Sequence, residues 1–411
     1  MAINRLDIVA AATRIASEVI RTPLIDARID GRRVWLKCEC LQTGGAFKLR
    51  GATNRLLRLD NEQRARGVVA FSSGNHAQGV AIAARRLGIA ATIVMPADAP
   101  QLKIDGTRGE GATIIFYDRR TEDREAISAK LAAETGATVV PSFDDEHIIA
   151  GQGSVGLEIL EQLAEANASP PPSIAIPVGG GGLASGIALA CPQARIVGAE
   201  PEGWDDMARS LAGGAIVPVA ADAPATLCDA LQTPRVSPIT FSILQARQAR
   251  IVAVTDGHVT AAVRWAFVEH RLVVEPGGAA ALAALLAGTT EVEEGMVIVL
   301  SGGNVDPALH ARLVAEAAAV RYSPGSRCDG LDRSTAWVNS SSSEARICNS
   351  AASALGSHSA RLAEASSNVS SIIAMHGRIV SSIRSNASSR RVCCWSSVIE
   401  RTDATIWVKS S

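Results

Sequence analysis

The chain has 411 residues, of which 47% are hydrophobic and 20% charged, and its formal net charge is −1. This composition predicts a globular protein with enough apolar side chains for the cores of two domains. A nearly neutral chain has no overall field that attracts nucleic acid or anionic membranes, so we expect neither as a partner. No apolar run approaches the roughly 20 residues that a membrane-spanning helix needs.

Charged residues interrupt the N-terminal segment at Arg5, Asp7, Arg14 and Glu18. The pattern predicts an amphipathic helix that ends at Pro23, and not a signal peptide. The eight cysteines include no CxxC pair and no second cluster at metal-ligand spacing, so we expect no structural zinc. Without a secretory signal, reduced thiols and a cytoplasmic location are expected.

Short β-branched runs alternate with alanine-rich helical segments along most of the chain. The predicted strands lie at 33–39, 67–73, 91–96, 112–118, 137–143, 173–180, 194–200, 250–256 and 296–303. Helices are expected between them, for example at 75–88, 122–136 and 275–288. This alternation predicts an α/β protein with largely parallel sheets. The strands are nearly continuous apolar runs, which indicates that helices cover both faces of each sheet.

The composition changes after about residue 322. About a quarter of residues 322–411 are serine, and the alternation of strands and helices ends. Three of the six tryptophans, Trp337, Trp395 and Trp407, lie in this polar segment. We expect it to be disordered and assign it no function. A reading-frame change near residue 322 is our hypothesis for the break, and sequencing the coding DNA through that point would test it.

Four loops that follow predicted strands are rich in glycine and small polar residues. They read SSGNHAQG at 72–79, GGGGLASG at 179–186, EPEGWDD at 200–206 and SGGN at 301–304. In open α/β sheets, ligands bind beyond the carboxyl ends of the strands. We therefore expect the loops to form one composite active site.

The glycine loop gives the strongest of these signals. It consists of Gly179, Gly180, Gly181 and Gly182, between a predicted strand and a predicted helix. Backbone N–H groups at a helix N-terminus suit a phosphate group, and a flexible turn is the plainer alternative. The GK[ST] ending of a Walker loop is missing, and Ser185 stands at the third glycine of a dinucleotide fingerprint. A phosphate monoester suits the loop better.

The other loops each have a plain alternative. The hydroxyls and N–H groups at 72–79 suit a carboxylate, and ordinary helix capping can coexist with such binding. A lone histidine is more often structural than catalytic, so we interpret His76 as a residue that shapes this loop. Ser301 either caps a turn or faces a ligand. The carboxylates in EPEGWDD can ligate a hard cation, although a solvated acidic turn is the better explanation from these residues alone.

Lys48 lies in the stretch GGAFKLRGATN, directly after Phe47 and among small residues. It is either a surface lysine with a buried stem or an amine held in a cleft for chemistry. A phosphate cradle, a carboxylate loop and a lysine beside an aromatic ring are the parts that a pyridoxal-phosphate enzyme needs. The lysine would form the Schiff base, and burial would lower its pKa so that it can act as a base.

In combination these motifs resemble those of the fold-type II pyridoxal-phosphate enzymes, in particular the threonine/serine dehydratase and serine racemase group. The resemblance runs from about residue 5 to residue 320 and implies two open, largely parallel twisted sheets flanked by helices. It implies a large cofactor-binding domain at 1–66 and 146–321 and a small substrate-loop domain at 67–145, followed by the tail at 322–411. Family members usually form homodimers or homotetramers, and we expect the same here.

GAFKLRGA resembles the segment that bonds the cofactor, which makes Lys48 the Schiff-base lysine and packs Phe47 on the ring. Ala46 stands where the group more often has serine. SSGNHAQG resembles the substrate loop. By this match Ser73 donates or accepts a proton on the face opposite Lys48, and Asn75 hydrogen-bonds the 3-oxygen of the ring.

The same match places the carboxylate site at Ser72, Gly74 and His76. Cysteine-synthase relatives carry Thr-Gly after the asparagine, so the His-Ala pair here favours the dehydratase branch. The four glycines match the phosphate loop, and Glu275 is expected near the cofactor. Ser301 matches the residue that faces the pyridine nitrogen. A neutral hydroxyl there does not keep the ring protonated, which favours loss of a β-leaving group.

In this group a cation is bound by a Glu, a backbone carbonyl and an Asp of the acidic loop. The matching positions are Glu200, the carbonyl of Trp204, and Asp206. We expect Mg²⁺ or Ca²⁺ there as a structural or activating ion. A regulatory domain of the threonine deaminase type is not recognisable, so feedback by isoleucine is not expected.

The resemblance implies an ammonia-lyase that converts L-threonine or L-serine to a 2-oxo acid and ammonia. Lys48 would remove the α-proton, and the cofactor phosphate would assist departure of the β-hydroxyl. Phenylserine or 3-hydroxyaspartate as the substrate, and racemisation of serine, stay open. Two other classes are less favoured. A non-catalytic amino-acid sensor would not need an intact Lys48, and a nicotinamide oxidoreductase would need a better glycine fingerprint.

Overall fold

The computed structural model of the protein describes residues 3–316, 397–402 and 405–410. The chain divides into residues 1–323 and residues 324–411, and each part is described by itself. In the second part, β11 (Ser397–Thr402) and β12 (Thr405–Ser410) pair as an antiparallel hairpin. The remainder of the serine-rich segment, for which we expect disorder, lies outside the described residues.

The larger sheet has six strands in the order β1-β2-β10-β7-β8-β9. They are β1 (Leu24–Ile29), β2 (Arg32–Lys37), β7 (Ser173–Pro177), β8 (Arg195–Pro201), β9 (Arg250–Val254) and β10 (Met296–Val299). All neighbours are parallel except β1 and β2, which form an antiparallel hairpin. Its two-residue turn, Asp30 and Gly31, has positive φ at both positions, as a tight hairpin turn requires.

The smaller sheet has four parallel strands in the order β5-β4-β3-β6. They are β3 (Val68–Phe71), β4 (Ala91–Pro96), β5 (Thr113–Tyr117) and β6 (Thr138–Val139). All four lie within the segment 67–145, and the strands of the larger sheet lie outside it. The nine predicted strands are all present, and β1 is an addition. The predicted α/β class with two largely parallel sheets is therefore confirmed.

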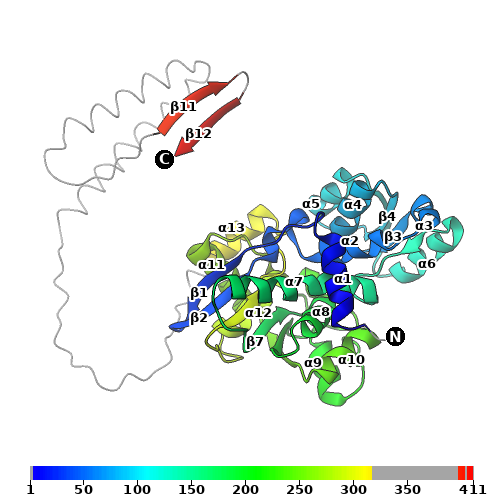
Figure 1. Ribbon diagram of the computed structural model, residues 1–411. Coiled ribbons are helices and arrows are strands. Elements are labelled where there is room, and N and C mark those ends of the chain that lie inside the picture. The colour runs from blue at the N-terminus through cyan, green and yellow to red at the C-terminus, as the bar shows by residue number, and fades with distance from the viewer. Residues whose placement is uncertain (1–2, 317–396, 403–404, 411) are drawn as a thin grey trace, which may run out of the picture. The chain divides into compact units, whose positions relative to one another are not determined.

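Helices surround both sheets (Figure 1). They are α1 (Arg5–Ile15), α2 (Lys48–Leu57), α3 (Asn61–Arg66), α4 (Asn75–Leu87), α5 (Gln101–Gly109), α6 (Arg124–Thr135), α7 (Glu146–Glu165), α8 (Gly182–Ala190), α9 (Asp206–Gly213), α10 (Pro238–Ala246), α11 (Asp256–His270), α12 (Pro276–Leu286) and α13 (Pro307–Glu316). Three short 3₁₀ turns are η1 (Glu39–Leu41), η2 (Thr43–Gly45) and η3 (Asp229–Leu231). Within the described residues, no helix combines the length and the apolar character that crossing a membrane demands.

The first helix is shorter than predicted. It ends at Ile15 and not at Pro23. The side chain of Gln42 explains the difference, because its amide pairs with both the N–H and the C=O of Ile20, at 2.9 and 2.8 Å. These bonds hold the backbone of Ile20 against η1 and η2 instead of in a continued helix.

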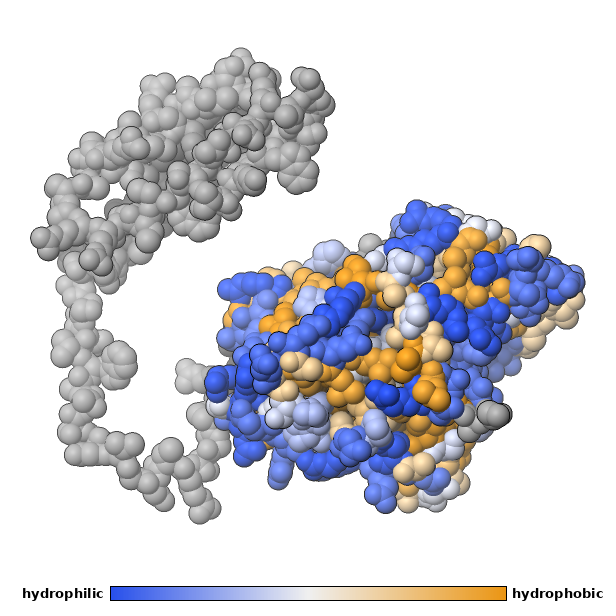
Figure 2. Space-filling view, in the orientation of Figure 1, coloured by the Kyte–Doolittle hydropathy of each residue, from blue (hydrophilic) through white to orange (hydrophobic). Residues whose placement is uncertain are grey.

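Alternate residues of the larger sheet belong to two different hydrophobic cores. Val34 and Leu36 of β2 pack with Ile298 of β10 on one face, and Trp35 packs with Val297 on the other. Side chains of a strand point alternately to opposite faces, so a sheet covered on both faces needs apolar residues throughout. The outer surface mixes polar residues with exposed apolar ones on the face seen in Figure 2.

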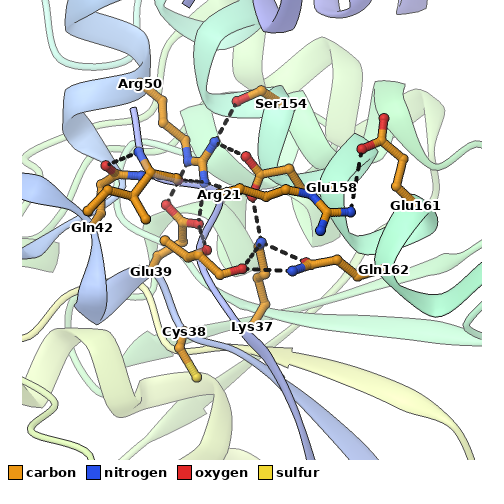
Figure 3. A network of polar contacts seen from close by, with 12 residues as sticks. Arg21, Lys37, Cys38, Glu39, Gln42, Arg50, Ser154, Glu158, Glu161 and Gln162 are labelled. Atoms are coloured by element: carbon orange, nitrogen blue, oxygen red, sulfur yellow. Dashed lines mark hydrogen bonds and ion pairs between the residues drawn. The ribbon is translucent and has the colours of Figure 1, made fainter. Parts of the chain in front are cut away.

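A buried ion network joins β2, η1, α2 and α7 (Figure 3). The guanidinium of Arg50 is fully buried and donates to Glu39 at 2.8 and 2.9 Å and to Glu158 at 2.6 and 2.9 Å. The amine of Lys37 donates to Glu158 at 2.6 Å and to Gln162 at 2.9 Å. Burial alone would raise the pKa of Glu39, but the charge and hydrogen bonds of Arg50 hold this pKa below its usual value. Two cations thus balance two carboxylates.

Replacing Arg50 tests whether this network holds the fold together. In Arg50→Met the carboxylates of Glu39 and Glu158 stay buried without their partner, and we expect the free energy of unfolding to fall by about 3–5 kcal/mol. Arg21→Met is the matched control, because Arg21 pairs with Glu165 at the surface and should contribute less than about 1 kcal/mol. Urea unfolding of both variants measures the difference, and equal losses would contradict the assignment.

Candidate active site

The predicted catalytic, cofactor-binding and substrate-binding residues meet in one cavity of about 960 Å³. It lies at the carboxyl ends of β3, β7 and β10, where the loops 72–76 and 179–182 and Ser301 follow their strands. Its walls include Phe47, Lys48, Ser72, Ser73, Gly74, Asn75, His76, Gly179, Gly180, Gly181, Gly182, Glu275 and Ser301. The fold therefore brings residues from widely separated parts of the sequence to one place.

Lys48 is the first residue of α2, and its amine is enclosed in this cavity. Nζ donates a hydrogen bond to the backbone carbonyl of Ser142 at 2.9 Å and lies 5.1 Å from the centre of the Phe47 ring. Burial lowers the pKa of the amine to about 8. Within the described residues no carboxylate forms an ion pair with it. Lys48 is thus an amine held in a cleft and ready to lose its proton, and not a snorkelling surface lysine.

The glycine loop leaves room for an anion that side chains would fill. Gly181 is the N-cap of α8 with φ of 85°, a conformation that favours glycine. A Cβ at Gly180 would lie 2.3 Å from the Phe143 ring, and one at Gly182 would lie 2.5 Å from Oε1 of Gln152. The first N–H groups of α8 have no side-chain cap. Free N–H groups at the positive end of a helix suit a phosphate.

The loop after β3 offers a second uncapped helix N-terminus. No side chain caps α4, whereas Asp123 caps α6 and Asp145 caps α7. Within the loop, the Gly74 N–H donates to Oγ of Ser72 at 3.2 Å. The first N–H groups of α4 are therefore available to an anionic group in the cavity, as a carboxylate site requires.

Asn75 and Glu275 form a buried pair on the cavity wall. Nδ2 of Asn75 donates to Oε1 of Glu275 at 2.5 Å, and Oδ1 accepts a bond from Asn304 at 2.9 Å. Burial raises the pKa of Glu275 to about 7, although the charge of Lys103 opposes the rise. Oε2 of Glu275 is buried without a partner among the described residues. The pair leaves an unused polar atom beside the cavity, which a polar ligand can engage.

His76 is a buried and neutral part of the loop. Its Nε2 lies 2.9 Å from the carbonyl oxygen of Val140, and burial, followed by the nearby Lys48 charge, lowers its pKa to about 3. Such a histidine does not titrate near neutral pH. This environment supports a role in shaping the loop, as the sequence predicts.

Comparison with known proteins identifies the family that uses such a cavity. A family model described as pyridoxal-phosphate dependent enzyme matches residues 15–302. The chain belongs to this family. An L-threo-3-hydroxyaspartate ammonia-lyase of Pseudomonas sp is 43% identical over 317 residues, which cover 75% of this chain and 97% of the relative.

Two solved structures extend the comparison. A threonine deaminase from the organism abbreviated T.th. is 41% identical, with a TM-score of 0.69 over 74% of this chain and 99% of that chain. Maize serine racemase is 38% identical, with a TM-score of 0.71 over 77% of this chain and 98% of that chain. These similarities confirm the predicted fold-type II group of pyridoxal-phosphate enzymes, including its ammonia-lyases and racemases.

The residues of the cavity fit pyridoxal phosphate. The glycine cradle is open only because Gly180 and Gly182 lack side chains, and the Lys48 amine is buried in the same cavity. Two buried polar atoms, Oε2 of Glu275 and Nδ1 of His76, have no partner among the described residues. A phosphorylated aldehyde with a polar ring matches this combination of amine, anion site and unused polar atoms.

The cavity also contains residues that the sequence did not single out. They are Phe71, Lys103, Arg124, Ser142, Phe143, Pro177, Leu183, Asp229, Ala230, Leu231, Gln232 and Thr233. Lys103 forms an ion pair with Asp229, which joins α5 to η3. The guanidinium carbon of Arg124 lies 5.4 Å from the centre of the Phe71 ring. These residues stand on helix faces or in irregular segments, and no motif marks them.

The predicted metal ligands lie away from this cavity, around the N-terminus of α9. Both carboxylate oxygens of Glu200 accept backbone N–H groups of that helix, at 3.1 and 2.9 Å. Burial raises the pKa of Asp206 to about 7 and that of Glu200 well above its usual value. Oδ2 of Asp206 is buried without a partner in the described part of the chain. Across residues 3–316, no group of three or more His, Cys, Asp or Glu side chains is placed to hold a metal ion.

Proposed function

We propose that this enzyme is an ammonia-lyase that removes the β-hydroxyl of a β-hydroxy amino acid and yields a 2-oxo acid and ammonia. The observation that carries the proposal is the Lys48 amine, with its pKa lowered to about 8, in one cavity with the uncapped N-termini of α4 and α8. One amine and two anion sites match a substrate carboxylate, a cofactor phosphate and a base.

When bound, pyridoxal phosphate supplies the electron sink that makes loss of the α-proton possible. The glycines of the cradle would hold its phosphate, and Lys48 would bond it. Once displaced by the substrate amine, Nζ of Lys48 removes the α-proton, and its lowered pKa makes it a competent base near neutral pH. The N–H groups at the start of α4 orient the substrate carboxylate.

The remaining predicted residues receive proposed roles on the same cavity wall. Ser73 holds a proton on the face opposite Lys48. Asn75 contacts the 3-oxygen of the ring, and Phe47 packs against the ring. Ser301 is 5% exposed and presents an uncharged hydroxyl to the ring nitrogen. These roles rest on the motif match and on the common cavity.

We propose L-threo-3-hydroxyaspartate as the preferred substrate. The Pseudomonas relative carries that substrate in its name, and the cavity contains a cation suited to a second carboxylate. Arg124 lines the cavity and has no carboxylate partner among the described residues, whereas Lys103 is paired with Asp229. A guanidinium can bind a carboxylate through two parallel hydrogen bonds. L-threonine and L-serine stay the second candidates, since the chain is similar to a threonine deaminase.

Ammonia release from purified enzyme tests this substrate choice. We expect kcat/KM to be highest for L-threo-3-hydroxyaspartate among that compound, L-threonine, L-serine and phenylserine. Arg124→Gln should lower this value by about 10- to 100-fold, because it removes a charge-assisted pair, and change kcat/KM for L-serine by less than about threefold. Arg120→Gln, which replaces a surface arginine paired with Asp118, is the control. Preference for L-threonine, with equal losses for all substrates in Arg124→Gln, would favour the second candidates.

We also propose that Mg²⁺ or Ca²⁺ binds Glu200, the carbonyl of Trp204, and Asp206. Two buried carboxylates with raised pKa and one unpartnered oxygen support it, since a cation would stabilise their charged forms. Adding either ion to chelator-treated enzyme should raise Tm by several degrees, about 2.7 kcal/mol at 100 times Kd. Asp206→Asn should abolish the rise, and Asp205→Asn should retain it. An unchanged Tm of the unmodified protein would exclude the site.

A further inference from the structure

The sequence AGQG in α7, which no predicted role uses, lies where three elements of the active site meet. A Cβ at Gly151 would lie 2.5 Å from the carbonyl oxygen of Arg50 in α2. A Cβ at Gly153 would lie 2.8 Å from the carbonyl oxygen of Gly186 in α8. The two glycines therefore let α7 approach both the helix that carries Lys48 and the helix that follows the phosphate cradle. Gln152 stands between them.

The Gln152 side chain is fully buried and reaches the partner of the Lys48 amine. Its Nε2 donates to the carbonyl oxygen of Ser142 at 3.2 Å, and the same oxygen accepts the bond from Nζ of Lys48 at 2.9 Å. A Cβ at Gly51 would lie 3.0 Å from Cγ of Gln152, and one at Gly182 would lie 2.5 Å from Oε1. The amide thus occupies space that glycines keep open on both neighbouring helices.

One end of this amide is satisfied and the other is not. Oε1 of Gln152 has no hydrogen-bond partner in the described part of the chain. A buried amide kept only for packing normally has both ends satisfied, because an unpaired polar atom away from water is costly. The cost is accepted at the one point where Nε2 can hold the Ser142 carbonyl.

We propose that Gln152 is a positioning residue for Lys48. It fixes the Ser142 carbonyl as the acceptor that holds the Lys48 amine whenever this amine is not bonded to the cofactor. The carbonyl stabilises the protonated amine and so offsets part of the burial that lowers its pKa. It also keeps Nζ at the cavity, where the amine must act as a base. The inference rests on the proposed function, since it assigns Lys48 that role.

The test compares Gln152→Leu with Gln162→Leu, in protein freed of cofactor. Gln162 is an amide of the same helix that bonds Thr22 and Lys37 and does not line the cavity, so it controls for loss of a structural amide. The readout is the rate at which added pyridoxal phosphate produces its visible absorbance band, measured against pH. Only the unprotonated amine reacts, so this rate reports the amine pKa.

We expect the unmodified protein and Gln162→Leu to show a midpoint near pH 8. In Gln152→Leu the midpoint should fall by about half a pH unit or more, because the protonated amine loses its fixed acceptor. With substrate, kcat should drop by about tenfold and KM should change by less than about twofold, since the substrate-binding groups stay in place. If Gln152→Leu does not fold, as circular dichroism would show, Gln152→Met provides the same comparison.

The outcomes separate this inference from the proposed function. A midpoint and a kcat in Gln152→Leu that equal those of Gln162→Leu would overturn the positioning role alone. Absence of any cofactor band in the unmodified protein would overturn the proposed function, and the inference with it. A lower midpoint together with a lower kcat, at an unchanged KM, would establish Gln152 as the residue that positions Lys48.

Discussion

The buried guanidinium of Arg50 is the interaction on which the geometry of the active site depends. It lies two residues after Lys48 in α2 and binds carboxylates from η1 and α7. Because a buried charge without its partner is costly, these elements cannot separate without a large loss of stability. The network therefore fixes the helix that begins with Lys48 against the helix that carries Gln152. The position of the amine follows from ion pairs outside the cavity as much as from contacts within it.

The electrostatics of the cavity favour a neutral amine between anion sites. Burial lowers the pKa of Lys48 to about 8 and that of His76 to about 3, so neither group carries a firmly held proton at mildly alkaline pH. Glu275, with its pKa raised to about 7, adds little negative charge below that pH. The positive ends of α4 and α8 remain without carboxylate caps. A phosphate and a carboxylate can enter this environment without meeting competing anions at those ends.

The sequence predicts the frame of this site well because parallel strands leave a strong signal. Both faces of β10 are buried, so its residues are apolar throughout, and the polar loop after it stands out. The hairpin strand β1 was missed because Asp26 and Arg28 interrupt its apolar pattern, and only its Asp-Gly turn marks it. Residues at strand ends, such as Ser73, were found from motifs. Arg124 and Asp229 were not, since only tertiary packing brings their surfaces to the cavity.

The central claim is that Lys48 bonds the cofactor, and chemical trapping tests it most directly. Purified protein is treated with pyridoxal phosphate and borohydride, digested, and examined by mass spectrometry. The account predicts one modified peptide, which contains Lys48, and loss of the modification in Lys48→Ala. Modification at Lys103, which lines the same cavity, or no modification at all, would contradict it.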